Sequence, residues 1–405
     1  MNLPDFIAKR TIDAKEGSFS GSISRIAVSS IAIGLATMLI SILILGGFRQ
    51  KITEKIYGFT GHLQVSKYTL SNSFESSPTS RDTKFYKNWQ RYDYIENVQA
   101  FAYKAGLLKA KEAIEGVIIK GVTTDFDTLN FSTNLVKGRF PNLRQEQYAK
   151  EVMISEKLAK LLSIQLNEKV LMYFVQNPPR YRQLTVVGIF STGLEEFDDK
   201  VIIGDLALIQ RLNSWDDDQV GGYEVFLKST ADHAVAEEQI YEQVDPDQFV
   251  SNTKQRHGQY FDWLDLLDQN VRVFLALILF VACFNMAAVL FILILERTNM
   301  IGLLKAVGAN NGLIRRIFFF SGIRLTLKGL FYGNALALGL AAIQFYFKII
   351  PLDAENYYMS FVPIRWNFEA ILFINLLVVV LVGFALVLPT VLVTKLKPIK
   401  AIKFD

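Results

Sequence analysis

The chain has 405 residues, of which 51% are hydrophobic and 20% charged, and its formal net charge is +4. Length alone predicts two or three domains, and this apolar composition excludes an ordinary soluble protein. The small positive charge lies mainly in the basic flanks of apolar segments, so it does not indicate a nucleic-acid-binding protein. The single cysteine, Cys283, excludes an intrachain disulfide, so any external domain has to be held by core packing.

Four windows of the sequence carry no charged residue and are mainly apolar. They lie between Arg25 and Arg49, between Arg272 and Glu296, between Lys328 and Lys348, and between Glu369 and Lys395. Each holds roughly 19 to 25 residues, and a helix of roughly 20 residues crosses a ~30 Å hydrocarbon core. A buried helix of a soluble protein is the alternative for one window, but four in one chain favour a membrane protein. We therefore predict transmembrane helices at residues 23–48, 271–295, 317–347 and 368–394.

Basic residues flank these windows unevenly, which predicts the orientation of the chain in a membrane. Lys and Arg concentrate before the first window, between the second and third, and after the fourth. We therefore predict that the segment 296–316 and both termini are cytoplasmic. The termini are residues 1–22, read as an interfacial helix or a flexible tail, and residues 395–405. Residues 49–270 and the loop 348–367 are predicted on the other side.

Small and polar residues inside the windows predict how the spans end and pack. Gly46 and Gly47 mark the expected outer end of the first span, which we interpret as an uncleaved signal anchor because no small-x-small site follows before Arg49. Asn285 and Asn334 lie within predicted spans, where we expect them to form hydrogen bonds between helices.

The region 49–270 alternates short apolar runs with turn residues and has the mixed pattern of an α+β domain. Strands are predicted at residues 62–67, 98–111, 113–122, 151–154, 169–175, 183–190, 201–203 and 223–227. Helices are predicted at 155–162, with Ser155 as its cap, and at 205–212 and 231–244. The predicted fold class is an α-helical membrane protein with four transmembrane helices and a large α+β domain inserted between helices 1 and 2.

A short amphipathic segment connects the second and third windows. The helical spacing i, i+3, i+4, i+7 places four apolar residues on one face, namely Met300, Leu303, Leu304 and Val307. Gly308 is the residue type expected just after a helix C-terminus, and Asn310 suits the N-cap of the next helix. Such a helix, held at a membrane surface between two spans, is well placed to dock another protein. An amphipathic helix resting on lipid is the alternative.

The order of several segments resembles a family of four-span ABC transporter permeases, the FtsX-like and MacB-like superfamily, and within it the lipoprotein-releasing (Lol-type) permeases. The segment 296–309, ERTNMIGLLKAVGA, is similar to the cytoplasmic coupling segment of that family. Residues 135–139 (LVKGR) followed by 152–162, residues 222–225 (GYEV), and the loop 352–363 resemble its external parts. The likeness covers nearly the whole chain.

The resemblance implies a permease subunit without enzymatic activity, placed beside a second permease, identical or homologous, above an ABC ATPase dimer. The sequence contains no G-x-x-x-x-G-K-[ST] phosphate-binding loop, so we expect ATP and Mg²⁺ to bind only in a partner chain and no cofactor in this one. The residues implied in ATPase coupling are Glu296, Arg297, Gly302, Leu303, Lys305, Ala306 and Gly308.

Two further sites follow from the resemblance. Residues 176–182 join two predicted strands where one Lol-type permease carries a hairpin that recruits the soluble lipoprotein carrier, which points to Pro178, Pro179 and Tyr181. An ordinary turn is the alternative for this loop. A lipid-anchored substrate also needs an apolar path between the first two spans, for which we expect Met38, Ile42, Phe280, Phe284 and Met286. Ordinary helix packing and lipid exposure explain these five residues equally well.

Enzymatic chemistry has little support in the sequence. His62, His233 and His257 are far apart and show no metal-ligand spacing, and residues 216–218 (DDD) are read as a solvated turn rather than a cation site. A membrane-tethered hydrolase is therefore disfavoured.

The leading hypothesis is a permease of the inner membrane that extracts lipoproteins from the outer leaflet and passes them to a periplasmic carrier, driven by a separate ATPase. Its partners would be the ATPase dimer, the second permease, the lipoprotein, the carrier and membrane lipid, with no nucleic acid. One alternative within the superfamily is efflux of peptides or drugs, or transmembrane signalling to cell-wall hydrolases. Another is a scaffold whose external domain only binds a partner, which leaves the segment 296–309 without a role.

Overall fold

The computed structural model describes residues 19–68, 75–111, 113–143, 148–228 and 232–392. Most of the predicted segment 1–22, and all of the predicted tail 395–405, lie outside these residues. The chain divides into two compact units. The helical unit consists of Met1–Gln50, Trp263–Pro351 and Phe361–Asp405, and the α/β unit consists of Lys51–Asp262 and Leu352–Ser360.

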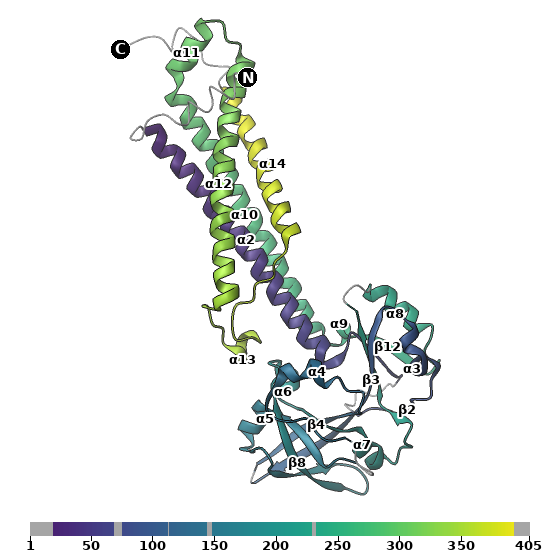
Figure 1. Cartoon of the computed structure of the whole chain (residues 1–405). Helices are drawn as coiled ribbons and strands as arrows, with labels where there is room; N and C mark the ends of the chain where they lie inside the picture. Colours follow the sequence, from purple (N-terminus) through teal and green to yellow (C-terminus); the bar gives the residue numbers. More distant parts are fainter. Residues whose placement is uncertain (1–18, 69–74, 112, 144–147, 229–231, 393–405) are drawn as a thin grey trace. The chain divides into compact units, whose positions relative to one another are not determined.

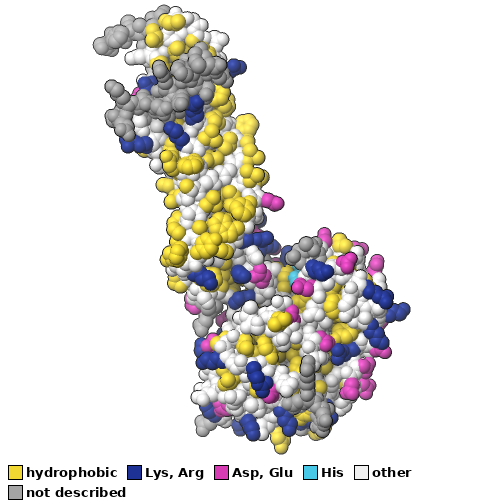
Figure 2. Space-filling view, in the orientation of Figure 1, with side chains coloured by type: hydrophobic (Ala, Val, Ile, Leu, Met, Phe, Trp, Pro, Cys, Tyr) yellow, Lys and Arg dark blue, Asp and Glu magenta, His cyan; other side chains and the backbone are white. Residues whose placement is uncertain are grey.

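Four long helices dominate the helical unit: α2 (Phe19–Thr60), α10 (Gly258–Glu296), α12 (Asn311–Phe347) and α14 (Phe368–Leu392). Within the described residues these four are long and apolar enough to cross a membrane, which confirms the prediction of four apolar helices. They run side by side (Figure 1) and share one core, to which they contribute Leu39, Leu290, Leu325 and Val382 among others. On the face shown in Figure 2, hydrophobic side chains cover the helices, whereas charged side chains are scattered over the α/β unit.

Polar side chains fix the helices at two places in this apolar unit. The Asn285 amide donates to the Ser30 hydroxyl at 2.9 Å, which joins α10 to α2. Asn334 of α12 and Asn375 of α14 exchange amide hydrogen bonds of 2.7 and 3.0 Å. The expectation that Asn285 and Asn334 bond between helices is confirmed. In an apolar environment each such bond contributes about 0.6–1.7 kcal/mol and fixes the rotation of one helix against its neighbour.

The helix α2 runs without a break through Gly46 and Gly47, which the sequence places at the outer end of the first span. α2 continues to Thr60, and Gly47 instead allows the segment that follows Phe361 to approach closely. A Cβ atom at Gly47 would lie 2.6 Å from the Pro363 carbonyl oxygen, and the Arg365 N–H donates to the Leu43 carbonyl at 3.1 Å. The glycine therefore serves packing, because any side chain would push this segment away.

The α/β unit is built on one large sheet with the strand order β12-β1-β11-β3-β4-β9-β6-β8-β5, while β7 pairs with both β3 and β8. The bounds are β1 Leu63–Lys67, β3 Ile95–Ala110, β4 Ala113–Val122, β5 Leu135–Gly138, β6 Glu151–Ser155, β7 Lys169–Phe174, β8 Arg180–Phe190, β9 Val201–Asp205, β11 Gly222–Leu227 and β12 Gln248–Asn252. The long strand β3 pairs with β11, β4 and β7 in turn and so joins the two halves of the sheet. β2 (Thr79–Ser80) and β10 (Gln219–Val220) form a separate pair.

Short helices lie at the strand ends, and their caps are readable in the sequence. They are α3 Lys84–Asn88, α4 Thr128–Phe131, α5 Glu156–Leu161, α6 Glu195–Asp198, α7 Leu206–Asn213, α8 His233–Tyr241, α9 Thr253–Arg256 and α13 Ala354–Tyr357. The Ser155 hydroxyl accepts from the Leu158 N–H at 3.0 Å and starts α5, as expected. The Asp205 carboxylate does the same for α7 through the Ala207 N–H at 3.0 Å.

Most predicted strands are present, with shifted ends. β3 begins three residues earlier than the predicted strand 98–111, and α8 is shorter at both ends than the predicted helix 231–244. β8 begins at Arg180 rather than at residue 183, so only residues 175–179 separate it from β7. Residues 180–182 lack the apolar alternation of a strand, although backbone pairing with β7 extends to Arg180.

The most deeply buried charges of the described residues form an ion pair between two strands. The Lys120 ammonium of β4 lies 2.8 Å from the Glu224 carboxylate of β11, and each side chain is 1% exposed. The ammonium also donates to the Phe59 carbonyl and lies 4.5 Å from the centre of the Phe59 ring, near the last residue of α2. Burial raises the pKa of Glu224 and lowers the pKa of Lys120, and their mutual attraction opposes both shifts.

We predict that Lys120→Met destabilises the α/β unit by about 3–5 kcal/mol, because it leaves the Glu224 carboxylate buried without a counter-charge. Replacing both residues, as in Lys120→Met/Glu224→Leu, is expected to recover at least half of this loss. The measurement is urea unfolding of the chain in detergent, followed by fluorescence of Trp89 and Trp215, which pack against the α/β core.

The matched control is Lys160→Met, which breaks the exposed Lys160–Glu156 pair of 3.3 Å and should cost less than about 0.5 kcal/mol. Equal losses for the two single variants would contradict the prediction.

Candidate functional site

The segment implied in coupling forms the short helix α11 (Thr298–Ala306) between α10 and α12. It ends where the sequence predicts. Gly308 has a left-handed φ of +95°, and the Ala309 N–H donates back to the Leu304 carbonyl at 2.9 Å. The Asn310 side chain accepts from the Leu313 N–H at 2.7 Å and caps α12. Both predictions, for Gly308 and for Asn310, are confirmed, and the two caps fix the turn between the helices.

The predicted single apolar face of α11 is divided in the structure. Ile301 is fully buried in the helical core, and Met300 and Leu304 pack against the same core. Leu303 and Val307, by contrast, are 64% and 81% exposed. Met300, Leu303, Leu304 and Val307 keep the predicted helical spacing, but only Met300 and Leu304 contact the core, because the core takes the side of the helix centred on Ile301. Leu303 and Val307, one turn apart, are left as an outward apolar pair.

The remaining residues implied in coupling lie on or beside this helix. Glu296 is the last residue of α10 and is exposed, as are Ala306 and Gly308, whereas Arg297 and Lys305 are half-buried. Gly302 is buried beside Ile301. The structure therefore places Gly302, Leu303, Lys305 and Ala306 on α11 and the other three near its ends, with Leu303 and Ala306 exposed and Gly302 buried.

The hairpin of β7 and β8 carries the second predicted site. Pro178 and Pro179 lie in the connection, but Tyr181 belongs to strand β8 rather than to the loop. Tyr181 pairs directly with Tyr173 of β7, their ring centres are 6.1 Å apart, and Tyr181 is 64% exposed. Tyr173 in turn lies opposite Leu107 of β3, which is 40% exposed. Together with Val175, 79% exposed, these side chains form an apolar row that the sequence did not reveal.

The residues expected along an acyl-chain path are not brought together on one surface. Met38 and Met286 are 3% and 1% exposed and belong to the helical core. Phe280 and Phe284 lie one turn apart on the outer side of α10 and are 69% and 67% exposed. Ile42 is half-buried between these extremes. The two methionines fill space between the helices and belong to their core. The two phenylalanines form an exposed aromatic pair.

A contact that sequence reasoning missed centres on Lys55 of α2. Its ammonium donates to the carbonyls of Thr192 and Tyr358, each at 2.7 Å. We name this three-segment contact the Lys55 clamp. Its partners are 137 and 303 residues away in sequence, and both offer only a backbone carbonyl, so no residue type marks the contact.

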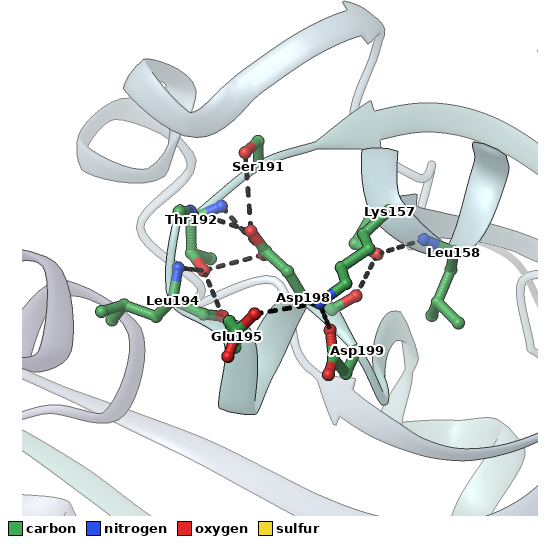
Figure 3. Close-up of polar contacts among 10 residues, drawn as sticks. Lys157, Leu158, Ser191, Thr192, Leu194, Glu195, Asp198 and Asp199 are labelled. Carbon is green, nitrogen blue, oxygen red and sulfur yellow. Dashed lines mark hydrogen bonds and ion pairs between the residues drawn. The ribbon is translucent and has the colours of Figure 1, made fainter. Parts of the chain in front are cut away.

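The turn that presents Thr192 is held by the Asp198 carboxylate (Figure 3). Asp198 accepts from the Thr192 N–H at 3.0 Å, from its hydroxyl at 2.8 Å and from the Gly193 N–H at 2.8 Å. The Asp198 backbone carbonyl accepts from the Ser155 hydroxyl at the start of α5. Burial raises the pKa of Asp198, against the hydrogen bonds of the turn and the positive charge of Lys55. The turn is thereby tied to the strand and helix behind it.

Two histidines far apart in sequence also meet. The rings of His62 and His233 are 5.0 Å apart, and Tyr57 lies against His62 at 4.3 Å. The His62 Nδ1 accepts from the Leu227 N–H at 3.0 Å. Burial and the nearby His233 lower the pKa of His62 from 6.5 to about 4, so His62 is neutral in the folded protein. Among the described residues, no group of three or more His, Cys, Asp or Glu side chains is arranged to hold a metal ion.

One face of the sheet carries a cavity of about 530 Å³ lined by aromatic and polar side chains, among them Phe101, Tyr103, Glu75, Glu196 and Arg256. Its carboxylates are engaged by neighbours: Glu75 with Lys104 at 3.0 Å and Glu196 with His257 at 3.1 Å.

Comparison with known proteins covers the whole chain. Residues 24–243 match the family model of the MacB-like periplasmic core domain, and residues 272–398 match that of the FtsX-like permease C-terminal region. The lipoprotein-releasing system transmembrane protein LolE of Haemophilus influenzae is 21% identical over 98% of both chains. LolC of Neisseria meningitidis serogroup B, described in the same words, is 22% identical over the full length of both. The crystal structure of the periplasmic region of MacB from Actinobacillus actinomycetemcomitans covers 52% of this chain and 98% of its own, with 16% identity and a TM-score of 0.37.

The His62 environment generates a pH prediction. Unfolded chains protonate histidine near pH 6.5, whereas folded His62 does so near 4, so between these values the unfolded state binds a proton that the folded state does not. The His62 contribution to stability is therefore complete well above pH 6.5 and declines by about 3 kcal/mol as the pH falls to 4.

His62→Asn keeps an acceptor near Nδ1 but does not titrate, so its unfolding free energy should fall less than that of the parent chain between pH 7 and 4.5. Urea unfolding in detergent at both values measures the difference. Parallel pH profiles for the two proteins would show that His62 is not the responsible group.

Proposed function

The chain belongs to the family of FtsX-like permeases with a MacB-like periplasmic core domain, and we propose that it is the permease subunit of an ABC transporter that releases lipoproteins from the inner membrane. It would extract lipoproteins from the outer leaflet and pass them to a periplasmic carrier. The observation that carries this proposal is the likeness along the full chain to proteins named as lipoprotein-releasing transmembrane proteins. Both halves of the chain contribute to that likeness, so it extends beyond a shared membrane domain.

The proposed topology has α2, α10, α12 and α14 crossing the inner membrane, with both termini and α11 in the cytoplasm. The α/β unit, which lies in the chain between α2 and α10, would be the periplasmic domain inserted between the first two spans. The uneven distribution of Lys and Arg supports this orientation, because basic residues gather at the connection that contains α11 and near both termini.

The energy would come from a partner ATPase dimer that docks on α11, since the sequence has no phosphate-binding loop of its own. Leu303 and Val307 form an outward apolar pair on a helix that Ile301 fixes to the core. An exposed apolar pair on a rigidly held helix suits insertion into a groove of a partner. ATP and Mg²⁺ would bind in that partner, and a second permease, identical or homologous, would complete the assembly.

The β7–β8 hairpin is the proposed contact for the carrier. Pro178 and Pro179 limit the freedom of the connection, which lowers the ordering cost of binding. The exposed row of Leu107, Tyr173, Val175 and Tyr181 offers an apolar surface beside them. For the acyl chains, the exposed Phe280 and Phe284 on α10 form the proposed lipid-facing surface, while Met38 and Met286 remain in the core.

We expect Leu303→Asp to weaken ATPase docking at least tenfold, because it places a charge at the centre of the proposed apolar contact. Leu303 is 64% exposed, so the fold of the chain should not change. The test purifies the permease with its ATPase in lipid and follows ATP hydrolysis on addition of a mature triacylated lipoprotein.

The matched control is Asn311→Asp, which adds the same charge at the exposed start of α12, two residues beyond the segment 296–309. Stimulation by lipoprotein in the parent and the control, and its loss in Leu303→Asp, would support the proposal. Stimulation by a peptide or drug but not by lipoprotein would favour efflux instead.

We expect Tyr181→Ser to reduce transfer to the carrier roughly tenfold while ATP hydrolysis stays unchanged, because exposed aromatic residues dominate such contacts. Transfer is measured as lipoprotein recovered in the soluble fraction with the carrier. Tyr241→Ser, which alters a residue 62% exposed on α8, is the control. Equal transfer by both variants would exclude the hairpin as the carrier contact.

A further inference from the structure

We propose that Lys55 is a positioning residue that fastens the connection between α12 and α14 to α2 and to the Thr192 turn, so that displacement of α12 or α14 is passed to the α/β unit. The coupling part of this inference rests on the proposed transport function. The fastening itself rests only on contacts inside the α/β unit.

The connection between α12 and α14 is itself divided between the two units. Residues Leu352–Ser360 belong to the α/β unit, whereas the chain on either side belongs to the helical unit. This stretch is closed on itself, because the Leu352 N–H donates to the Ser360 carbonyl at 3.0 Å and the Tyr357 N–H donates to the Asp353 carbonyl at 2.9 Å. It therefore behaves as a compact loop rather than as a slack linker.

Lys55 holds this loop through its backbone. The ammonium has three donors, and two of them reach the carbonyls of Thr192 and Tyr358 at 2.7 Å. Thr192 is 1% exposed, so its carbonyl would lose a partner in a dry environment if Lys55 were removed. Hydrogen bonds from a charged donor are about twice as strong as neutral ones, which suits a contact that has to bear displacement.

The backbone on both sides of the ammonium is shaped to receive it. Gly193 has a φ of +68°, and a Cβ atom there would lie 2.5 Å from the Lys55 Nζ and 3.3 Å from the Tyr358 carbonyl oxygen. Tyr358 itself has a φ of +60°, a region that bulky residues rarely adopt. Such a conformation persists only where its surroundings hold it, and here the Tyr260 ring packs edge-on against the Tyr358 ring at 5.8 Å.

The Thr192 side of the clamp is equally well anchored. Asp198 holds the turn through the N–H groups of Thr192 and Gly193, and its own carbonyl is tied to Ser155, where strand β6 ends and α5 begins. A pull on the 352–360 loop would therefore reach the central sheet through Lys55, the turn and Ser155. Two of the four places where the chain passes between units are the ends of this loop, at Pro351–Leu352 and Ser360–Phe361.

The test compares the parent complex with Lys55→Met, which keeps the length of the side chain but removes its donors. The complex, reconstituted in lipid with its ATPase, is treated briefly with chymotrypsin, and cleavage after Tyr357 and Tyr358 is quantified by mass spectrometry. We expect roughly tenfold faster cleavage in Lys55→Met, as loss of charge-assisted hydrogen bonds implies. Lipoprotein released per ATP hydrolysed should fall by a similar factor while ATP hydrolysis continues.

Lys51→Met is the matched control, because Lys51 lies one turn earlier on α2 and pairs only locally with Glu54 at 2.8 Å. If Lys55→Met does not fold, Gly193→Ala approaches the same contact from the other side, since its methyl group would displace the ammonium. Gly193→Ala is expected to show the same two effects, faster cleavage and lower lipoprotein release per ATP, but both smaller than in Lys55→Met. Unchanged cleavage, or unchanged release per ATP, in the folded variant would overturn the inference.

The two proposals fail in different ways. If the parent complex releases no lipoprotein, the proposed function is wrong, and the rate of chymotrypsin cleavage in Lys55→Met compared with Lys51→Met still decides the clamp. If the parent releases lipoprotein and Lys55→Met cleaves and releases like Lys51→Met, the clamp is wrong and the transport function stands.

Discussion

The buried ion pair of Lys120 and Glu224 determines where the end of α2 meets the sheet. Apolar contacts are not directional, so Phe59 alone could pack in several ways against neighbouring side chains such as Phe131 and Phe197. The Lys120 ammonium instead has one carboxylate and one carbonyl to satisfy, and it sits at the helix end where the carbonyl groups concentrate negative charge. A buried ion pair adds little net stability. Here it restricts the end of α2 to one arrangement against the sheet.

The same logic recurs along α2. At Gly47 a missing side chain lets the backbone of Pro363 approach, and at Lys55 one ammonium binds two carbonyls. Each contact depends on the path of the backbone. Exchanging one apolar side chain for another would therefore not restore the same contact in a different packing. Displacement within proteins passes through elements that have discrete arrangements, and contacts of this kind limit an element to one arrangement. α2 is thus an organising element of both units.

The parts predictable from sequence are those whose signal is local. Four apolar windows, alternating strands and caps such as Ser155 and Asn310 are determined by neighbouring residues, and these predictions are confirmed. Strand β8 was predicted too short, because residues 180–182 are held by backbone pairing that their polar side chains do not show. The Lys55 clamp and the His62–His233 contact could not be predicted, since their members lie more than a hundred residues apart and share no spacing.

The divided face of α11 shows why periodicity alone does not identify a docking surface. The spacing of Met300, Leu303, Leu304 and Val307 is the same whether the helix turns them inward or outward. The orientation of the helix is decided by Ile301, which lies outside that pattern and is fully buried. Because Ile301 faces the core, Leu303 and Val307 remain exposed. A helix of nine residues is marginal on its own, so its orientation is imposed by this anchor and by the caps at Gly308 and Asn310. Leu303 and Val307 are thus kept exposed by the anchoring of a helix too short to be stable by itself.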